Sequence, residues 1–82
     1  LHCYPNPAND FFNIDYYVPT NTKVTAILYN SLGTEVLSTD PTIQSTGQHS
    51  LQLETKTLSN GVYILKFYRG TDILTKKMTI TR

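Results

Sequence analysis

Apolar and polar residues alternate along most of the chain, in short runs that turn residues separate. The clearest run follows a turn at residues 58–61 and occupies residues 62–68, where β-branched and aromatic residues predominate. Within it Tyr63, Leu65 and Phe67 share one face, because successive side chains of a strand point to opposite sides. A strand of this kind needs a neighbour on each edge and a second layer over its apolar face. We therefore expect residues 62–68 to form a central strand.

Turn residues divide the rest of the chain into further short strands. The Arg-Gly-Thr-Asp sequence at residues 69–72 predicts a tight hairpin, which leads into a strand at residues 73–81 beside the central one. The run at residues 34–38 is short and stops at an Asp-Pro pair, so it suits the edge of a sheet. Residues 39–46 are polar and hold a marginal strand or none. The other expected strands are residues 1–4, 11–18, 23–30 and 47–54.

Alternation also predicts which side chains form the core. Lys76 falls on the core side of its strand, so we expect either a bulge there or a long side chain that reaches solvent. Leu58 precedes the central strand and is expected to close one end of the core. The other residues expected on core faces are Phe12, Ile14, Tyr16, Val18, Val24, Ala26, Leu28, His49, Leu51, Leu53, Leu74, Met78 and Ile80.

These patterns together predict the fold class. About seven short strands, at spacings of roughly 8–12 residues and without a 3.6-residue apolar period, are typical of an antiparallel β-sandwich. The sequence contains one cysteine and no tryptophan, so the pattern of antibody domains is missing. We therefore expect an all-β, immunoglobulin-like sandwich that shares the architecture of antibody domains but not their family.

Composition limits the size of the domain and its partners. The chain has 82 residues, enough for one domain with one thin core. Its net charge is +1 and 16% of its residues are charged, so it lacks the concentrated positive face of a nucleic-acid-binding protein. No apolar run approaches the roughly 20 residues that span a bilayer. The chain begins at Leu1, without an initiator methionine or a signal pattern, and we expect residues 1–82 to be cut from a longer polypeptide.

The sequence predicts neither a catalytic site nor a metal site. It lacks zinc-ligand spacings, a calcium-binding loop and a nucleophile-elbow sequence. His49 lies on the apolar side of its strand, where we expect a half-buried ring held by a hydrogen bond. Cys3 is expected to be a buried or half-buried apolar residue, and His2 points to the opposite face, where it is poorly placed to take the thiol proton. We therefore expect no enzyme activity, no metal and no cofactor.

Tyrosine offers a further candidate surface. The chain contains six tyrosines, and aromatic faces can stack on sugar rings. Tyr16 and Tyr63 occupy core positions. Packing on a sheet face is the competing explanation of the remaining residues. The tyrosines left for the surface are Tyr4, Tyr17, Tyr29 and Tyr68.

Four groups of residues, widely separated along the chain, form a further pattern. They are Tyr4-Pro5-Asn6-Pro7-Ala8 with Asp10, Phe12 and Ile14; Leu28-Tyr29-Asn30 with Gly33 and Val36; Leu58-Ser59-Asn60-Gly61-Val62-Tyr63-Ile64-Leu65; and Lys76-Lys77-Met78-Thr79-Ile80. In this order and at these distances, they resemble the C-terminal sorting domain of the type IX secretion system, or Por secretion system tail domain. The resemblance covers residues 4–82, and the order of the groups makes it more specific than any one of them.

The resemblance implies a delivery role. Domains of this family form the tail of secreted proteins of Bacteroidota, fold as immunoglobulin-like sandwiches, and direct an N-terminal cargo from the periplasm through the outer-membrane translocon. A cell-surface sortase-like cysteine protease commonly removes the tail and can join the cargo to lipopolysaccharide, so the product is surface-bound or secreted. The residues that the resemblance assigns to translocon recognition are Gly61, Tyr63, Lys76, Lys77, Met78, Ile80 and Arg82. Those of the family motif are Tyr4, Pro5, Asn6, Pro7, Asp10, Asn30 and Gly33.

Several explanations of the last strand stay open on the sequence alone. A lysine-bearing terminal strand offers backbone donors and acceptors to a receptor strand. Alternatively, Lys76, Lys77 and Arg82 only keep an edge strand from aggregating. The domain as a whole has two rival functions: an immunoglobulin-like module that binds carbohydrate or protein on a secreted enzyme, and a spacer beside a catalytic domain. An exposed edge also favours a strand-exchanged dimer of the isolated domain.

Overall fold

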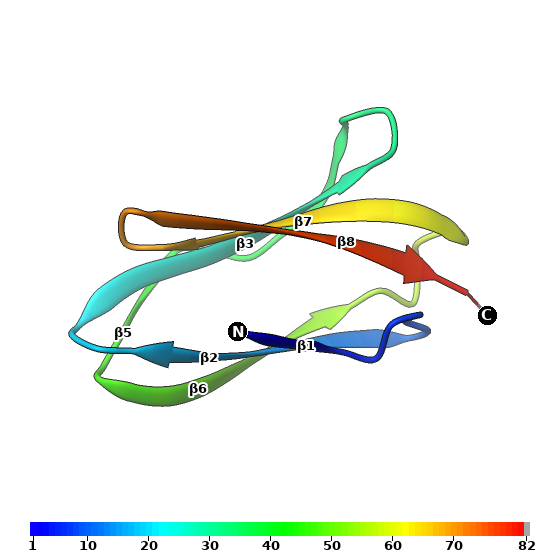
Figure 1. Cartoon of the computed structure of the whole chain (residues 1–82). Coiled ribbons are helices and arrows are strands. Elements are labelled where there is room, and N and C mark those ends of the chain that lie inside the picture. Colours follow the sequence, from blue (N-terminus) through cyan, green and yellow to red (C-terminus); the bar gives the residue numbers. More distant parts are fainter. Residues whose placement is uncertain (82) are drawn as a thin grey trace.

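The computed structural model describes residues 1–81, which fold into two antiparallel sheets that face each other (Figure 1). The predicted all-β sandwich is therefore confirmed. The strands are β1 (His2–Tyr4), β2 (Phe11–Val18), β3 (Thr22–Asn30), β4 (Glu35–Ser38), β5 (Thr42–Gln44), β6 (Gly47–Glu54), β7 (Gly61–Arg69) and β8 (Asp72–Ile80).

The order of the strands confirms the predicted centre and edges. The smaller sheet runs β1-β2-β6, and the larger runs β4-β3-β7-β8, with β5 also pairing with β3. Strand β7 thus has a neighbour on each edge, and β4 lies at the edge of its sheet. Residues Thr42–Gln44, where a marginal strand or none was expected, form β5. The described residues therefore form eight strands, against about seven expected.

The core fills the space between the sheets. Leu58 packs against it as a half-buried residue, as do Leu51 and Leu74. Lys76 is exposed although it lies on the core side, and β8 pairs with β7 without a register shift, so the long side chain rather than a bulge explains its place. The buried apolar residues of the core are Ala8, Phe12, Ile14, Tyr16, Val18, Val24, Ala26, Leu28, Leu53, Tyr63, Leu65, Phe67, Met78 and Ile80.

The two side chains with possible chemistry take the places expected of them. The ring of His49 is half-buried, its Nε2 lies 2.6 Å from the carbonyl oxygen of Ser45, and it stacks on Tyr16. Cys3 is half-buried. No three His, Cys, Asp or Glu side chains among residues 1–81 lie close enough together to hold a metal ion. In the same part of the chain, we find no helix with the length and apolar character of a membrane span.

Candidate functional site

The motif residues, which are far apart in the sequence, gather at one end of the sandwich. Strand β7 begins at this end, and its Tyr63 pairs with Asn30 of β3 on one side and with Met78 of β8 on the other. Two residues closer to the end, Gly61 pairs with Ile80. We call this region, where β3 and β8 finish and β7 begins, the motif end.

Asn30 and Gly33 build the turn between β3 and β4. The side-chain Oδ1 of Asn30 accepts hydrogen bonds from the backbone N–H groups of Leu32 and Thr34, both at 3.0 Å. The N–H of Gly33 donates to the Asn30 carbonyl at 3.0 Å, and Gly33 has a φ of +83°, a conformation that side chains rarely adopt. An asparagine side chain that accepts bonds from the following backbone is a common way to fix a turn.

Tyr63 ties the loop before β7 to the strand itself. Its ring is 5% exposed, and its hydroxyl donates a 2.7 Å hydrogen bond to the carbonyl of Ser59. A tyrosine hydroxyl that bonds to backbone a few residues upstream is a known device at the corners of β-sandwiches. Tyr63 therefore acts as a strut inside the motif end.

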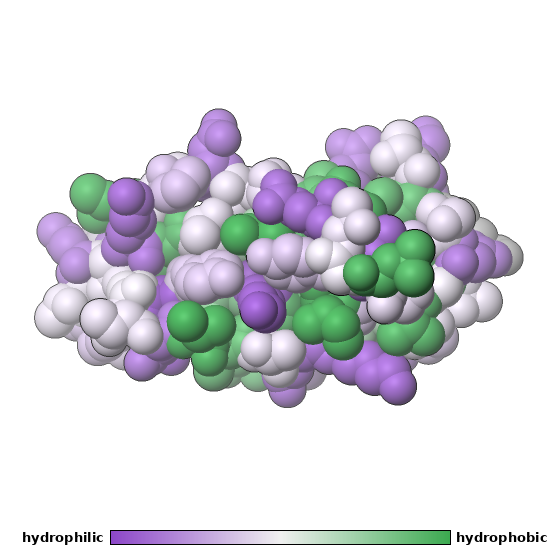
Figure 2. All heavy atoms as spheres, turned by 90° about the horizontal axis from the view of Figure 1, so that it is seen from above, coloured by the Kyte–Doolittle hydropathy of each residue, from purple (hydrophilic) through white to green (hydrophobic). Residues whose placement is uncertain are grey.

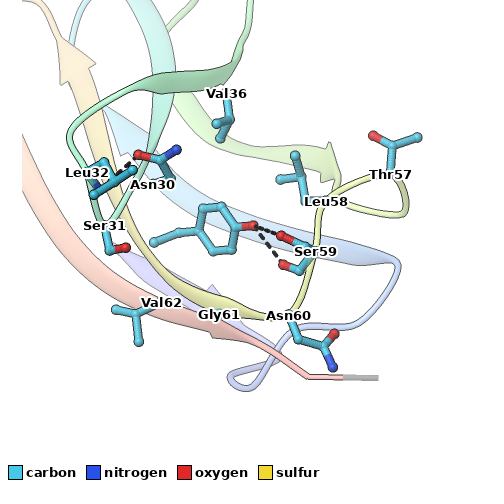
Figure 3. A pocket seen from close by; sticks show the side chains of 11 residues that line it. Asn30, Ser31, Leu32, Val36, Thr57, Leu58, Ser59, Asn60, Gly61 and Val62 are labelled. Atoms are coloured by element: carbon cyan, nitrogen blue, oxygen red, sulfur yellow. Dashed lines mark hydrogen bonds between the residues drawn. The ribbon is translucent and has the colours of Figure 1, made fainter.

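An open pocket of about 440 Å³ lies at the motif end (Figure 3). Asn30, Ser31 and Leu32 lie on one side of it, opposite the loop that carries Thr57 and Ser59. Its lining residues carry hydroxyl, amide and aliphatic groups, together with the phenol of Tyr63, whose hydroxyl donates to the Ser59 carbonyl.

The connection between β1 and β2 binds the last residues of β8. The N–H of Ala8 donates to the carbonyl of Thr79 at 2.7 Å, and the N–H of Thr81 donates to the carbonyl of Ala8 at 2.9 Å. The N–H of Thr79 also donates to Asn6 Oδ1 at 3.2 Å. Ala8 is fully buried. We call this contact of Asn6 and Ala8 with Thr79 and Thr81 the clasp; Figure 1 shows this connection beside the C-terminal end of β8.

The rest of the outer edge of β8 is open. In an antiparallel pair, backbone N–H and C=O groups point toward the partner at alternate residues and away from it at the others. Thr79 and Thr81 use theirs for the clasp, so by alternation the groups of Ile73, Thr75 and Lys77 also point away from β7. No strand of the described chain pairs with them. We call this stretch, residues 73–77, the open edge.

Two lysines flank the open edge on opposite faces of the sheet. Lys76 lies on the inner face near Cys3; burial raises the pKa of the Cys3 thiol, and the positive charge of Lys76 lowers it in part. Lys77 lies on the outer face and pairs with Ile64. Within residues 1–81 the ion-pair contact is between Arg69 and Asp72, at 3.4 Å, so neither lysine has a carboxylate partner there.

Burial divides the residues predicted to contact the translocon. Tyr63, Met78 and Ile80 are buried, whereas Gly61 is exposed. The open-edge lysines are exposed as well, and Arg82 lies outside the described residues. The role of this set in recognition stays a prediction, and the geometry separates members that can touch a partner from members that shape the strand.

Several contacts at the motif end cannot be predicted from the residue types in the sequence. The backbone groups of Thr79 and Thr81 carry the clasp, and any residue type can supply such groups. Thr55 is fully buried, and its hydroxyl donates to the carbonyl of Asn9 at 2.7 Å, while its N–H donates to the Asp10 carbonyl at 2.8 Å. Asp10 of the family motif thus helps to fix the start of β2.

The four surface tyrosines do not form a single platform. Tyr29 and Tyr68 lie together on the outer face of the larger sheet. Desolvation raises the pKa of Tyr29, and the charge of Tyr68 and then a hydrogen bond with it raise this pKa further. Tyr4 and Tyr17 lie on the smaller sheet. Figure 2 shows that the apolar patches on the upper face of the molecule are separated by polar side chains. This arrangement weakens the stacking surface expected of a carbohydrate-binding module.

Comparison with known proteins agrees with the residue pattern at the motif end. A family model described as the secretion system C-terminal sorting domain matches residues 2–81. Searches of curated proteins and of solved structures gave no match. The chain therefore belongs to the family of C-terminal sorting domains of type IX secretion, tails that mark their cargo proteins for export to the cell surface or the medium.

Proposed function

We propose that this sorting domain engages the outer-membrane translocon of type IX secretion through the open edge of β8. A strand of the receptor adds to this edge, and its backbone forms hydrogen bonds with the backbone of Ile73, Thr75 and Lys77. Its side chains contact the side chains on the two faces of the sheet. Strand addition uses main-chain hydrogen bonds for affinity and alternate side chains for specificity. The single observation that carries the proposal is the regular, exposed and unpaired edge at residues 73–77.

Charge favours the same surface. Lys76 and Lys77 project to opposite faces of one edge and have no carboxylate partner among residues 1–81. A receptor strand with acidic side chains can therefore meet a positive charge on either face, and such complementarity raises the association rate and the specificity of a complex. Lysine at an edge also keeps identical chains from pairing, so both roles are compatible.

The buried members of the predicted set support recognition indirectly. Met78 and Ile80 anchor the last residues of β8 in the core, and Tyr63 pairs with Met78 from the central strand. Met78 and Ile80 have no exposed surface and cannot touch a receptor while the domain stays folded, and Tyr63 is only 5% exposed. We assign to these residues the task of holding the open edge straight.

The remaining steps follow the family role. In this proposal the domain is the tail of a longer secreted cargo protein, crosses the outer membrane by way of the periplasm, and is then removed by a cell-surface sortase-like protease at or before its start. The tail is a substrate of that protease and has no catalytic function itself.

Reporter export tests the proposal. The domain is fused to the C-terminus of an inert fluorescent protein in a type IX-competent bacterium, and the reporter is measured in the periplasm, at the surface and in the medium. We expect export from the intact fusion and periplasmic retention after deletion of residues 75–82 or after Lys77→Glu. Lys56→Glu, in the exposed loop after β6, is the matched control and should export normally. Export of the deleted fusion at the level of the intact one would refute the proposal.

A further inference from the structure

We infer that Asn6 and the backbone of Ala8 are positioning groups for translocon recognition, because they hold the end of the strand that carries the open edge. This inference rests on the proposed function. The sorting signal then has two parts: the open edge of β8, and the β1–β2 connection near the start of the domain, which fixes the geometry of the end of β8. The residues involved are about 70 positions apart in the sequence, as the Asn6–Thr79 hydrogen bond shows.

The clasp bonds to the same row of backbone groups that forms the open edge. Thr79 and Thr81 continue the outward-facing series of Ile73, Thr75 and Lys77. The clasp therefore occupies the last part of the edge as a short parallel neighbour of β8, with Ala8 pairing to Ile80. A receptor strand that adds to β8 finds free groups as far as Lys77 and meets the clasp beyond it.

The clasp also sets the direction in which β8 leaves the sheet. The end of an edge strand that bonds to one neighbour alone frays easily, since its outer groups are left to water. Here the last residues of β8 bond to β7 on one side and to the clasp on the other. Both partners are in place before any receptor binds, and such preorganisation lowers the ordering cost of binding.

Asn6 is the part of the clasp that a substitution can remove cleanly. Its side chain is exposed, and its Oδ1 accepts the hydrogen bond from the N–H of Thr79 at 3.2 Å. Asn6→Ala deletes the acceptor, whereas Asn6→Asp keeps an oxygen in the same place. Asn21→Ala changes an exposed asparagine in the turn before β3 and serves as the matched control.

The test combines a local and a functional measurement. Amide hydrogen exchange in the purified domain reports whether the Thr79 N–H is protected, and the reporter fusion reports export. We expect Asn6→Ala to speed the exchange of Thr79 about two- to ten-fold, the effect of one lost hydrogen bond, and to lower export with the thermal midpoint nearly unchanged. Asn6→Asp should restore both, and Asn21→Ala should alter neither.

Two outcomes would overturn the inference. Unchanged exchange at Thr79 would show that Asn6 does not hold the strand, and faster exchange with normal export would show that the held geometry is irrelevant to recognition. In either case the proposed function is decided separately by Thr75→Pro, which removes one outward N–H of the open edge and leaves the clasp and the buried Met78 and Ile80 in place. If a folded Thr75→Pro fusion is retained in the periplasm, the open edge stays the recognition surface and only the positioning role of the clasp falls.

Discussion

Two long strands of the sandwich have an unpaired outer edge, β6 in the smaller sheet and β8 in the larger, and they differ in charge and in support. The outward-facing residues of β6 are Gln48, Ser50, Gln52 and Glu54, which include no cation. Strand β8 carries two adjacent lysines and ends in the clasp. Lysines are therefore not a feature that the two open edges of this sandwich share.

The two strands also differ in how their ends are fixed. Strand β6 is followed by Thr55, whose buried hydroxyl and N–H bond to the carbonyls of Asn9 and Asp10, just before β2 of the same sheet. The end of β8 is held by a segment that belongs to the β1–β2 connection of the opposite sheet. The clasp thus joins the two layers at the motif end, next to the strand proposed for recognition.

The largest expected effect comes from the anchor of β8. Ile80 is fully buried, so Ile80→Ala should lower the free energy of unfolding by about 2–5 kcal/mol, through lost burial and the cavity left behind. Ile73, on the open edge, is 60% exposed, and Ile73→Ala should stay within about 0.5 kcal/mol. Urea denaturation followed by circular dichroism measures both. Equal losses would mean that β8 is not divided into an anchored end and an open edge.

A smaller effect is expected from the strut at the motif end. Tyr63→Phe removes the hydroxyl that donates to Ser59 and leaves the ring in place, so the loss should be about 0.5–1.5 kcal/mol. Tyr17→Phe, at an exposed ring on the smaller sheet, is the matched control and should cost almost nothing. Thermal unfolding distinguishes them. If the Tyr63→Phe domain is as stable as the control, the hydrogen bond between Tyr63 and Ser59 does not stabilise the motif end.

The smallest effect, on the pKa of the Cys3 thiol, distinguishes Lys76 on the inner face of the sheet from Lys77 on the outer face. The charge of Lys76 lowers the pKa of the Cys3 thiol, which burial raises. Lys76→Gln removes that charge, so the thiol pKa should rise, less thiolate should form at a given pH, and the rate–pH profile for alkylation should move to higher pH. Lys77→Gln, on the other face, should leave the profile unchanged. A shift caused by Lys77→Gln instead would contradict the assignment of faces.

The strands and the core could be predicted from the sequence because they depend on local alternation. Phe12, Ile14, Tyr16 and Val18 are buried as the period of two requires, and the hairpin at Arg69–Asp72 forms where the turn residues predict it. The sequence gives almost no signal for strand β5, because Thr42–Gln44 is short and its apolar residue, Ile43, is 75% exposed rather than buried in the core.

The motif end could be predicted only as a set of residues, without its geometry. Sequence order says nothing of the distance between Asn6 and Thr79, which chain topology alone brings together. The clasp also consists largely of backbone groups, which leave no mark in residue identity. Likewise, two of the four candidate tyrosines lie on each sheet. The order of the strands decides which sheet carries each tyrosine, and composition does not reveal that order.

Removal of one outward N–H group tests whether a receptor strand adds to the open edge. Thr75→Pro deletes a donor that points away from β7, and edge strands tolerate proline at such positions. Thr75→Val keeps the donor and loses only the hydroxyl. Gln48→Pro makes the same deletion on the outer edge of β6. Thermal unfolding checks that each variant is folded.

The measurement is the exported fraction of the reporter fusion for these three variants. We expect the Thr75→Pro fusion to be retained in the periplasm and the Thr75→Val and Gln48→Pro fusions to be exported like the unaltered fusion. Normal export of a folded Thr75→Pro fusion would contradict strand addition at β8, and its lysines would then serve only to protect the edge.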